Sequence, residues 1–115
     1  MSLALLAGAF ALTACGGGGG GGKTVDAANG TVSVSAEDIK YDVTKITAKP
    51  GKLAVTLNQG GNLDHTFTIG DQINLKVAGG TKTATGSLDL KAGETLTYVC
   101  TTPGHSNMHG TIEVK

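Results

Sequence analysis

Arginine and tryptophan are absent from this 115-residue chain, and cysteine and proline occur only twice each. Nine lysines balance nine carboxylates, so the chain lacks the basic excess by which proteins bind nucleic acids. The opening apolar stretch, residues 3–12, has about half the length of a membrane-spanning helix, which needs roughly 20 residues. Cys15 and Cys100 could form at most one disulfide, but their sequence surroundings differ so much that each needs its own explanation.

The first residues have features of an export signal. Residues 3–12 carry no charge and match the apolar region of a signal peptide in length. The following Leu12-Thr13-Ala14-Cys15 resembles the lipobox of bacterial lipoproteins, although no lysine or arginine precedes the apolar stretch. We therefore expect residues 1–14 to be a signal peptide and Cys15 to carry lipid, which would anchor the protein to a membrane in the periplasm or on the outer cell surface. The alternatives are a plain signal peptide, or a buried helix with an incidental cysteine.

A run of seven glycines, Gly16 to Gly22, follows the cysteine. Glycine loses the most conformational freedom on folding and has no side chain to bury, so the run is not expected to fold. A glycine-rich chain of this length spans on the order of 15 Å. We expect residues 15–29 to form the lipidated cysteine and a flexible tether, with Lys23 to Asn29 extending it.

Apolar and polar residues alternate from residue 30 onward. Val32 and Val34 alternate with polar residues, and so do Leu53 and Leu57 with their neighbours. This period of two is typical of strands that bury one face. Glycine-, proline- and asparagine-containing turns separate these segments. The pattern predicts one all-β domain over residues 30–115, a Greek-key β-sandwich or barrel of seven to eight strands.

The same alternation orients two side chains that can bind a metal. His65 and Cys100 each lie in phase with the apolar residues of their own strand, so both are expected to point inward near a strand end. His105 and Met108 follow Cys100 within nine residues. A thiolate, imidazoles and a thioether form a soft ligand set that suits copper, and two imidazoles with a thiolate and a weak axial methionine describe a blue-copper site.

The segments that carry these residues resemble cupredoxins, the small blue copper proteins of the plastocyanin and azurin superfamily. The resemblance covers residues 31–115, and it is carried by residues 58–69 around the first histidine, residues 98–105 between cysteine and second histidine, and the closing residues 110–114. It implies a single type 1 copper ion with the ligands His65, Cys100, His105 and, in the axial position, Met108.

The resemblance also implies a function. Members of the family transfer electrons by cycling between Cu(II) and Cu(I), so the chain is expected to be a monomeric carrier rather than an enzyme. Its expected partners are redox proteins (cytochromes, a terminal oxidase or a reductase) that dock transiently, with His105 as the electron exit. Thr66 and Thr101, each next to a ligand, are candidates for a hydrogen bond that ties the two ligand segments together.

The axial position has two candidates. Two residues separate His105 from Met108, whereas azurins have three and the amicyanin branch has two. An azurin-like count would instead select His109. Met108 matches the wider pattern, in which case its neighbour His109 should face outward.

Other interpretations of the same residues predict different chemistry. One cysteine and two histidines also form a catalytic zinc set with an open position, but methionine is a poor zinc ligand. A Cys100–His105 nucleophile pair would lack a third orienting group. An exported protein for copper transfer or storage could use the same ligands. An enzyme domain like those of multicopper oxidases would need more than the three histidines present.

Overall fold

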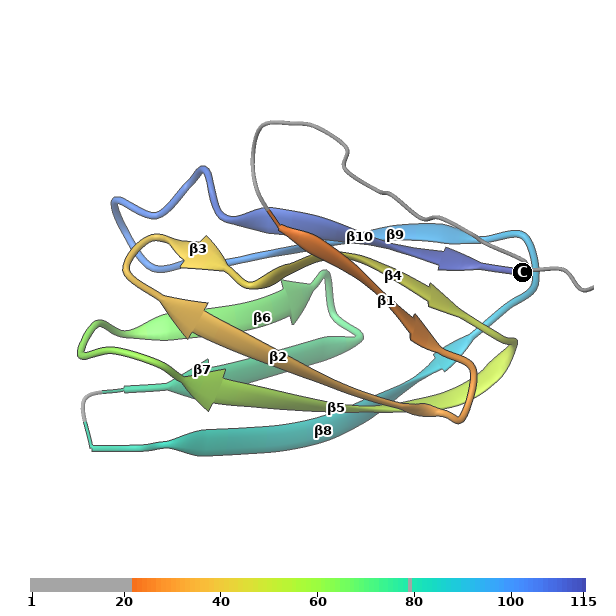
Figure 1. Ribbon diagram of the computed structural model, residues 1–115, viewed down its shortest axis with the longest axis horizontal. Helices are drawn as coiled ribbons and strands as arrows, with labels where there is room; N and C mark the ends of the chain where they lie inside the picture. The colour runs from red at the N-terminus through yellow and green to blue at the C-terminus, as the bar shows by residue number, and fades with distance from the viewer. Residues whose placement is uncertain (1–21, 79) are drawn as a thin grey trace, which may run out of the picture.

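The computed structural model describes residues 22–78 and 80–115, which form two mixed β-sheets packed into a sandwich (Figure 1). In spatial order, the strands of the larger sheet are β1 (Lys23–Ala27), β4 (Val43–Ala48), β10 (His109–Val114), β9 (Thr95–Val99), β6 (His65–Ile69) and β7 (Ile73–Val77). Those of the smaller sheet are β3 (Lys40–Tyr41), β2 (Thr31–Glu37), β5 (Gly51–Gln59) and β8 (Thr83–Leu90). The expected all-β sandwich is confirmed. These described residues contain no helix long and apolar enough to cross a membrane.

The core lies between the two sheets and follows the period-two pattern of the strands. In β5, for example, Leu53, Val55 and Leu57 are buried, and the intervening Ala54 is exposed. Because successive side chains of a strand point to opposite faces, every second residue joins the core. Burial of this apolar surface is the main force that holds the two sheets together.

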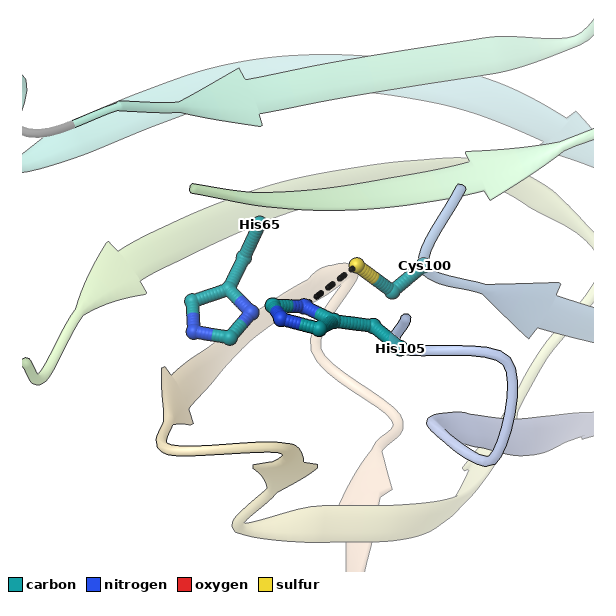
Figure 2. A group of neighbouring side chains, drawn as sticks. All are labelled: His65, Cys100 and His105. Atoms are coloured by element: carbon teal, nitrogen blue, oxygen red, sulfur yellow. Dashed lines mark hydrogen bonds between the residues drawn. The ribbon is translucent and has the colours of Figure 1, made fainter. Parts of the chain in front are cut away.

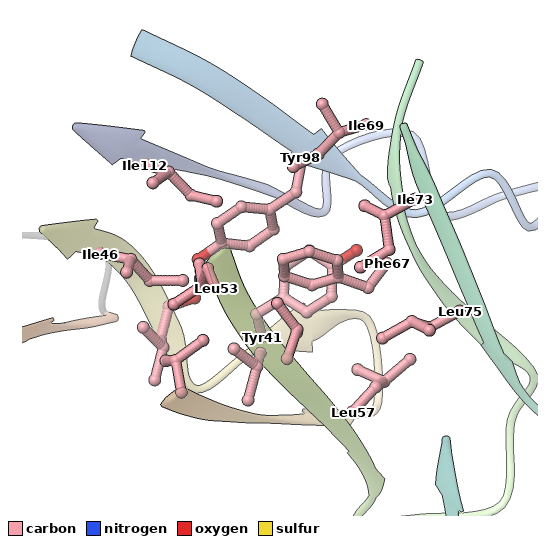
Figure 3. Packing of buried hydrophobic residues seen from close by; sticks show 14 of the residues in the cluster. Tyr41, Ile46, Leu53, Leu57, Phe67, Ile69, Ile73, Leu75, Tyr98 and Ile112 are labelled. Atoms are coloured by element: carbon pink, nitrogen blue, oxygen red, sulfur yellow. Dashed lines mark hydrogen bonds between the residues drawn. The ribbon is translucent and has the colours of Figure 1, made fainter. Parts of the chain in front are cut away.

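Three aromatic rings occupy the centre of the core (Figure 3). Phe67 stacks on Tyr98 with ring centroids 4.4 Å apart, and Tyr41 packs edge-on against Tyr98 at 5.2 Å. The Tyr98 hydroxyl donates a hydrogen bond to the Val43 carbonyl at 2.6 Å, which satisfies a buried polar group. On the neighbouring strand, the Tyr98 ring lies so close to Gly110 that a Cβ there would overlap it. The rings therefore fix the spacing between the sheets next to β9 and β10.

Two sequence-based expectations differ from the structure. The predicted tether extended to residue 29, but Lys23–Ala27 form β1, which pairs in parallel with β4. The domain has ten strands among its described residues rather than seven to eight; the alternation did not indicate β1, the two-residue β3 or β4. The predicted signal peptide and Cys15 lie outside the described residues.

The larger sheet opens at one end, between β6 and β9. Thr68 and Val99 are the pair in register between these antiparallel strands. Beyond them, β9 leads into the loop of residues 100–108, which lies at the same end of the sandwich as the start of β6 (Figure 1, left). This opening is where the side chains with metal-binding chemistry meet.

Candidate metal centre

Three of the predicted ligands converge in the opening between β6 and β9. His65 is the first residue of β6, Cys100 directly follows β9, and His105 lies in the loop before β10. One ligand atom from each lies within 4.8 Å of the others, and the Cys100 Sγ is 3.7 Å from the His105 Nδ1 (Figure 2). Exposed fractions of 0%, 5% and 7% for His65, Cys100 and His105 make this a nearly dry cluster.

Backbone hydrogen bonds fold the loop between β9 and β10 back on itself. The His105 N–H donates to the Thr102 carbonyl at 3.0 Å, and the Met108 N–H donates to the His105 carbonyl at 3.0 Å. The Cys100 N–H then donates to the Met108 carbonyl at 3.2 Å, which closes the loop. Gly104 supplies the positive φ of 87° that the first turn requires. Cys100, His105 and Met108 are thus held together by the backbone itself.

The two candidates for the axial position face opposite ways. The Met108 side chain is 1% exposed and belongs to the hydrophobic core. His109, the first residue of β10, is exposed, and its Nδ1 lies 3.1 Å from the Asn107 carbonyl oxygen. At the start of β10, the thioether of Met108 is therefore turned inward and the imidazole of His109 outward.

Thr66 joins the first histidine segment to the cysteine segment. Its hydroxyl lies 3.1 Å from the Thr101 hydroxyl and accepts a hydrogen bond from the Thr101 N–H at 2.8 Å, so the contact expected from the sequence is present. The Thr66 N–H donates to the Cys100 Sγ at 3.4 Å. The sequence alone did not identify this donor to the sulfur.

His65 is the side chain of the cluster whose buried polar atoms lack hydrogen-bond partners. Both ring nitrogens are buried, and neither has a hydrogen-bond partner. Burial, and secondarily the neighbouring His105, lowers the pKa of His65 below its ordinary value, while Asp64 and Asp38 act in the opposite direction. The ring is therefore neutral near pH 7 and offers a free lone pair. Since buried polar groups are normally paired, this orphaned imidazole beside a thiol and a second imidazole fits a metal ligand, and the donor set suits copper.

Cys15, the predicted lipid attachment point, lies outside the described residues.

Tyr41 was not singled out from the sequence, yet its hydroxyl donates a buried hydrogen bond to the Thr66 carbonyl at 2.5 Å. No sequence signal points to this contact, because it joins strands of different sheets.

No family model and no curated protein sequence matches the chain. Solved structures, in contrast, match the chain in fold. Auracyanin A, described as a "blue" copper protein from the green thermophilic photosynthetic bacterium Chloroflexus aurantiacus, matches with a TM-score of 0.63 and 18% identity over 74% of this chain and 98% of that one. Dithionite-reduced auracyanin from Roseiflexus castenholzii matches with a TM-score of 0.68 and 19% identity over 76% and 98%.

A reduced variant of amicyanin matches with a TM-score of 0.57 and 22% identity over 76% of this chain and 85% of that one. At sequence identities this low, the structural matches establish a likeness of fold alone. The chain has a cupredoxin-like fold.

Proposed function

We propose that this protein is an electron carrier whose single type 1 copper ion is held by His65, Cys100, His105 and Met108. The observation that carries the proposal is the buried His65 ring, whose two unpartnered nitrogens lie beside the Cys100 thiol and the His105 ring. Copper would supply a Cu(II)/Cu(I) couple at this position. The likeness to auracyanin A supports the same metal.

The protein's own contribution is a ligand set that is already in place. His65 comes from a strand, and the loop that carries the other three ligands is closed by its own backbone bonds. Such preorganisation limits the rearrangement that accompanies a change of oxidation state, and a rigid supporting shell keeps ligands oriented. The thiolate of Cys100 would accept the Thr66 N–H and thereby keep part of its charge stabilised by the protein.

Met108 is the better supported axial ligand, because its side chain is buried and that of His109 is exposed. His105 is the better supported electron exit, because it is 7% exposed while His65 is fully buried. Its loop neighbours Pro103 and Gly104 are exposed. A small surface of this kind suits brief, weak docking to redox proteins such as cytochromes, a terminal oxidase or a reductase.

The proposal includes attachment to a membrane through lipid on Cys15, with the protein in the periplasm or on the outer cell surface. Its support is the lipobox-like Leu12-Thr13-Ala14-Cys15 and the glycine run that follows. Because single acyl chains bind only marginally, stable anchoring would need more than one on this residue. Mass spectrometry of the membrane fraction tests this part. A mass that shows an S-diacylglyceryl group on Cys15, with or without a further acyl chain on its amino group, and that is lost in Cys15→Ser supports it. An unmodified mature chain overturns it.

The central test is the absorption spectrum of the purified protein loaded with Cu(II). We expect an intense visible thiolate-to-copper band that a mild reductant bleaches and re-oxidation restores. Cys100→Ser should abolish the band, whereas Ser106→Ala, an exposed change in the same loop, should keep it. A colourless protein that binds one zinc ion tightly would contradict the proposal.

Copper transfer or storage is the alternative that uses the same ligands, and retention of the metal separates the two. A carrier keeps its copper through repeated reduction and oxidation in the presence of a modest excess of a Cu(I) chelator. Loss of copper to the chelator on the first reduction would favour copper transfer.

A further inference from the structure

The backbone of Thr66 crosses the opening in the larger sheet. In an antiparallel ladder, the N–H and C=O of one residue point toward the same neighbouring strand. Thr66 directs its N–H toward the Cys100 segment, so its carbonyl also faces the region where β9 has left the ladder. The antiparallel register of Thr68 with Val99, if continued, would place the Thr101 N–H opposite this carbonyl. That N–H donates to the Thr66 hydroxyl instead, so the carbonyl needs another donor.

Tyr41 supplies the missing donor from the opposite sheet. Its side chain crosses the core from β3, is 3% exposed, and donates its hydroxyl to the Thr66 carbonyl at 2.5 Å. Burial, and secondarily Cys100, raises the pKa of the phenol, so the hydroxyl keeps its proton. Edge-on packing against Tyr98 and Phe67 holds the ring in place.

From these contacts we infer that Tyr41 is a positioning residue that holds Thr66 in the orientation in which its N–H reaches the Cys100 sulfur. This inference deepens the proposed function and rests on it for its redox consequence. Two successive hydrogen bonds carry it: hydroxyl of Tyr41 to carbonyl of Thr66, and N–H of Thr66 to Sγ of Cys100. Without the hydroxyl, the buried carbonyl loses its partner, and the strand shifts to find another.

The redox effect has a defined direction. A hydrogen bond to the thiolate withdraws electron density from the sulfur and so stabilises the reduced metal relative to the oxidised one, and hydrogen bonding at this sulfur tunes the potential of such sites. Weakening the Thr66 N–H contact should therefore favour the oxidised form. Tyr41→Phe removes the hydroxyl and leaves the packed ring.

Tyr98→Phe is the matched control. Tyr98 is also buried in the aromatic cluster and also donates its hydroxyl to a backbone carbonyl, but that carbonyl belongs to Val43 rather than Thr66. In a redox titration of the copper-loaded proteins, we expect Tyr41→Phe to favour the oxidised form about tenfold, which is about 59 mV for a one-electron couple. Tyr98→Phe should stay within twofold of wild type.

A second readout uses the copper-free protein. Amide hydrogen exchange by NMR should be at least tenfold faster at Thr66 in Tyr41→Phe than in Tyr98→Phe, after both are normalised to their global stability. Equal potentials and equal Thr66 exchange in the two variants would overturn the inference. If the wild-type protein forms no type 1 site, the proposed function fails, while the exchange comparison still decides the role of Tyr41.

Discussion

The Thr66 N–H donates a hydrogen bond to the Cys100 Sγ, although the two residues are 34 positions apart in the chain. The bond forms where the ladder between β6 and β9 ends, so a side-chain sulfur takes the place of a backbone carbonyl. Thr66 also accepts the Thr101 N–H through its hydroxyl. One residue thus fastens the segment of His65 to that of Cys100.

Replacing the Thr66 hydroxyl should destabilise the protein. Thr66→Val keeps the shape of the side chain but leaves the Thr101 N–H without its acceptor, which should lower the free energy of unfolding by about 1–3 kcal/mol. Urea denaturation of the copper-free protein measures the change. Thr66→Ser, which keeps the hydroxyl, should lose clearly less, and equal losses in both variants would contradict the assignment.

Met108 should set the redox potential and His109 should not. An axial thioether stabilises Cu(II) more than Cu(I), and its replacement in Met108→Leu should raise the midpoint potential by on the order of 59 mV, a tenfold change in the redox equilibrium. Protein-film voltammetry measures this. His109→Ala changes an exposed residue and should leave the potential in place. The reverse result would move the axial role to His109.

The copper-free protein should lose stability in acid because of His65. Burial and His105 lower the pKa of this group in the folded state, below its ordinary value of 6.5. Between the folded-state pKa and the ordinary pKa, the unfolded chain binds the proton more readily than the folded chain. The stability that the neutral His65 contributes is therefore complete above pH 6.5 and declines as the pH falls below it. Urea midpoints measured from pH 8 to pH 5 should decline less steeply in His65→Asn than in wild type. Parallel curves for the two proteins would show that His65 contributes nothing to the loss of stability in acid.

Gly110 should resist substitution because of the Tyr98 ring. A Cβ at Gly110 would overlap the Cζ and hydroxyl oxygen of that ring, and the ring is held in the aromatic stack and by its bond to Val43. Gly110→Ala should therefore lower the free energy of unfolding by about 1–3 kcal/mol. Gly80→Ala is the control, because nothing lies within 4 Å of a Cβ built there; equal thermal midpoints for the two variants would be inconsistent with this packing.

The positions of the proposed ligands were predictable because strand phase fixes which face a side chain occupies. His65 and Cys100 share the inward phase of their strands, and both are buried. Met108 and His109 are adjacent in the chain, and only one of them can face inward. In each case a local rule, the period of two, decided the outcome.

The same rule missed β4 because its phase changes within the strand. Val43 and Ile46 are both buried, three positions apart, and the pairing with β1 shifts register between Lys23 and Thr24. A bulge of this kind breaks simple alternation. β1 itself is largely exposed, with Ala27 as its buried residue, and it is defined by pairing with β4 rather than by its own pattern. Tyr41 acts across the two sheets, a relationship that only the folded chain creates.

The parallel pairing of β1 determines where a membrane anchor would join the domain. Thr24 lies opposite Lys45, and Lys45 lies opposite Thr111, only two residues beyond the start of β10 at His109. The chain therefore enters the domain at the end that carries His105, and the C-terminus lies at the other end (Figure 1).

With lipid on Cys15, the seven peptide units to Gly22 would form a tether of at most about 25 Å, attached at the end of the sandwich that carries the candidate metal centre. The greatest height at which electrons could leave the protein would then be limited by this tether, and would change by at most about 3.5 Å for each residue added or removed. A redox partner within that height would experience a high effective concentration of the carrier, and one beyond it would experience almost none.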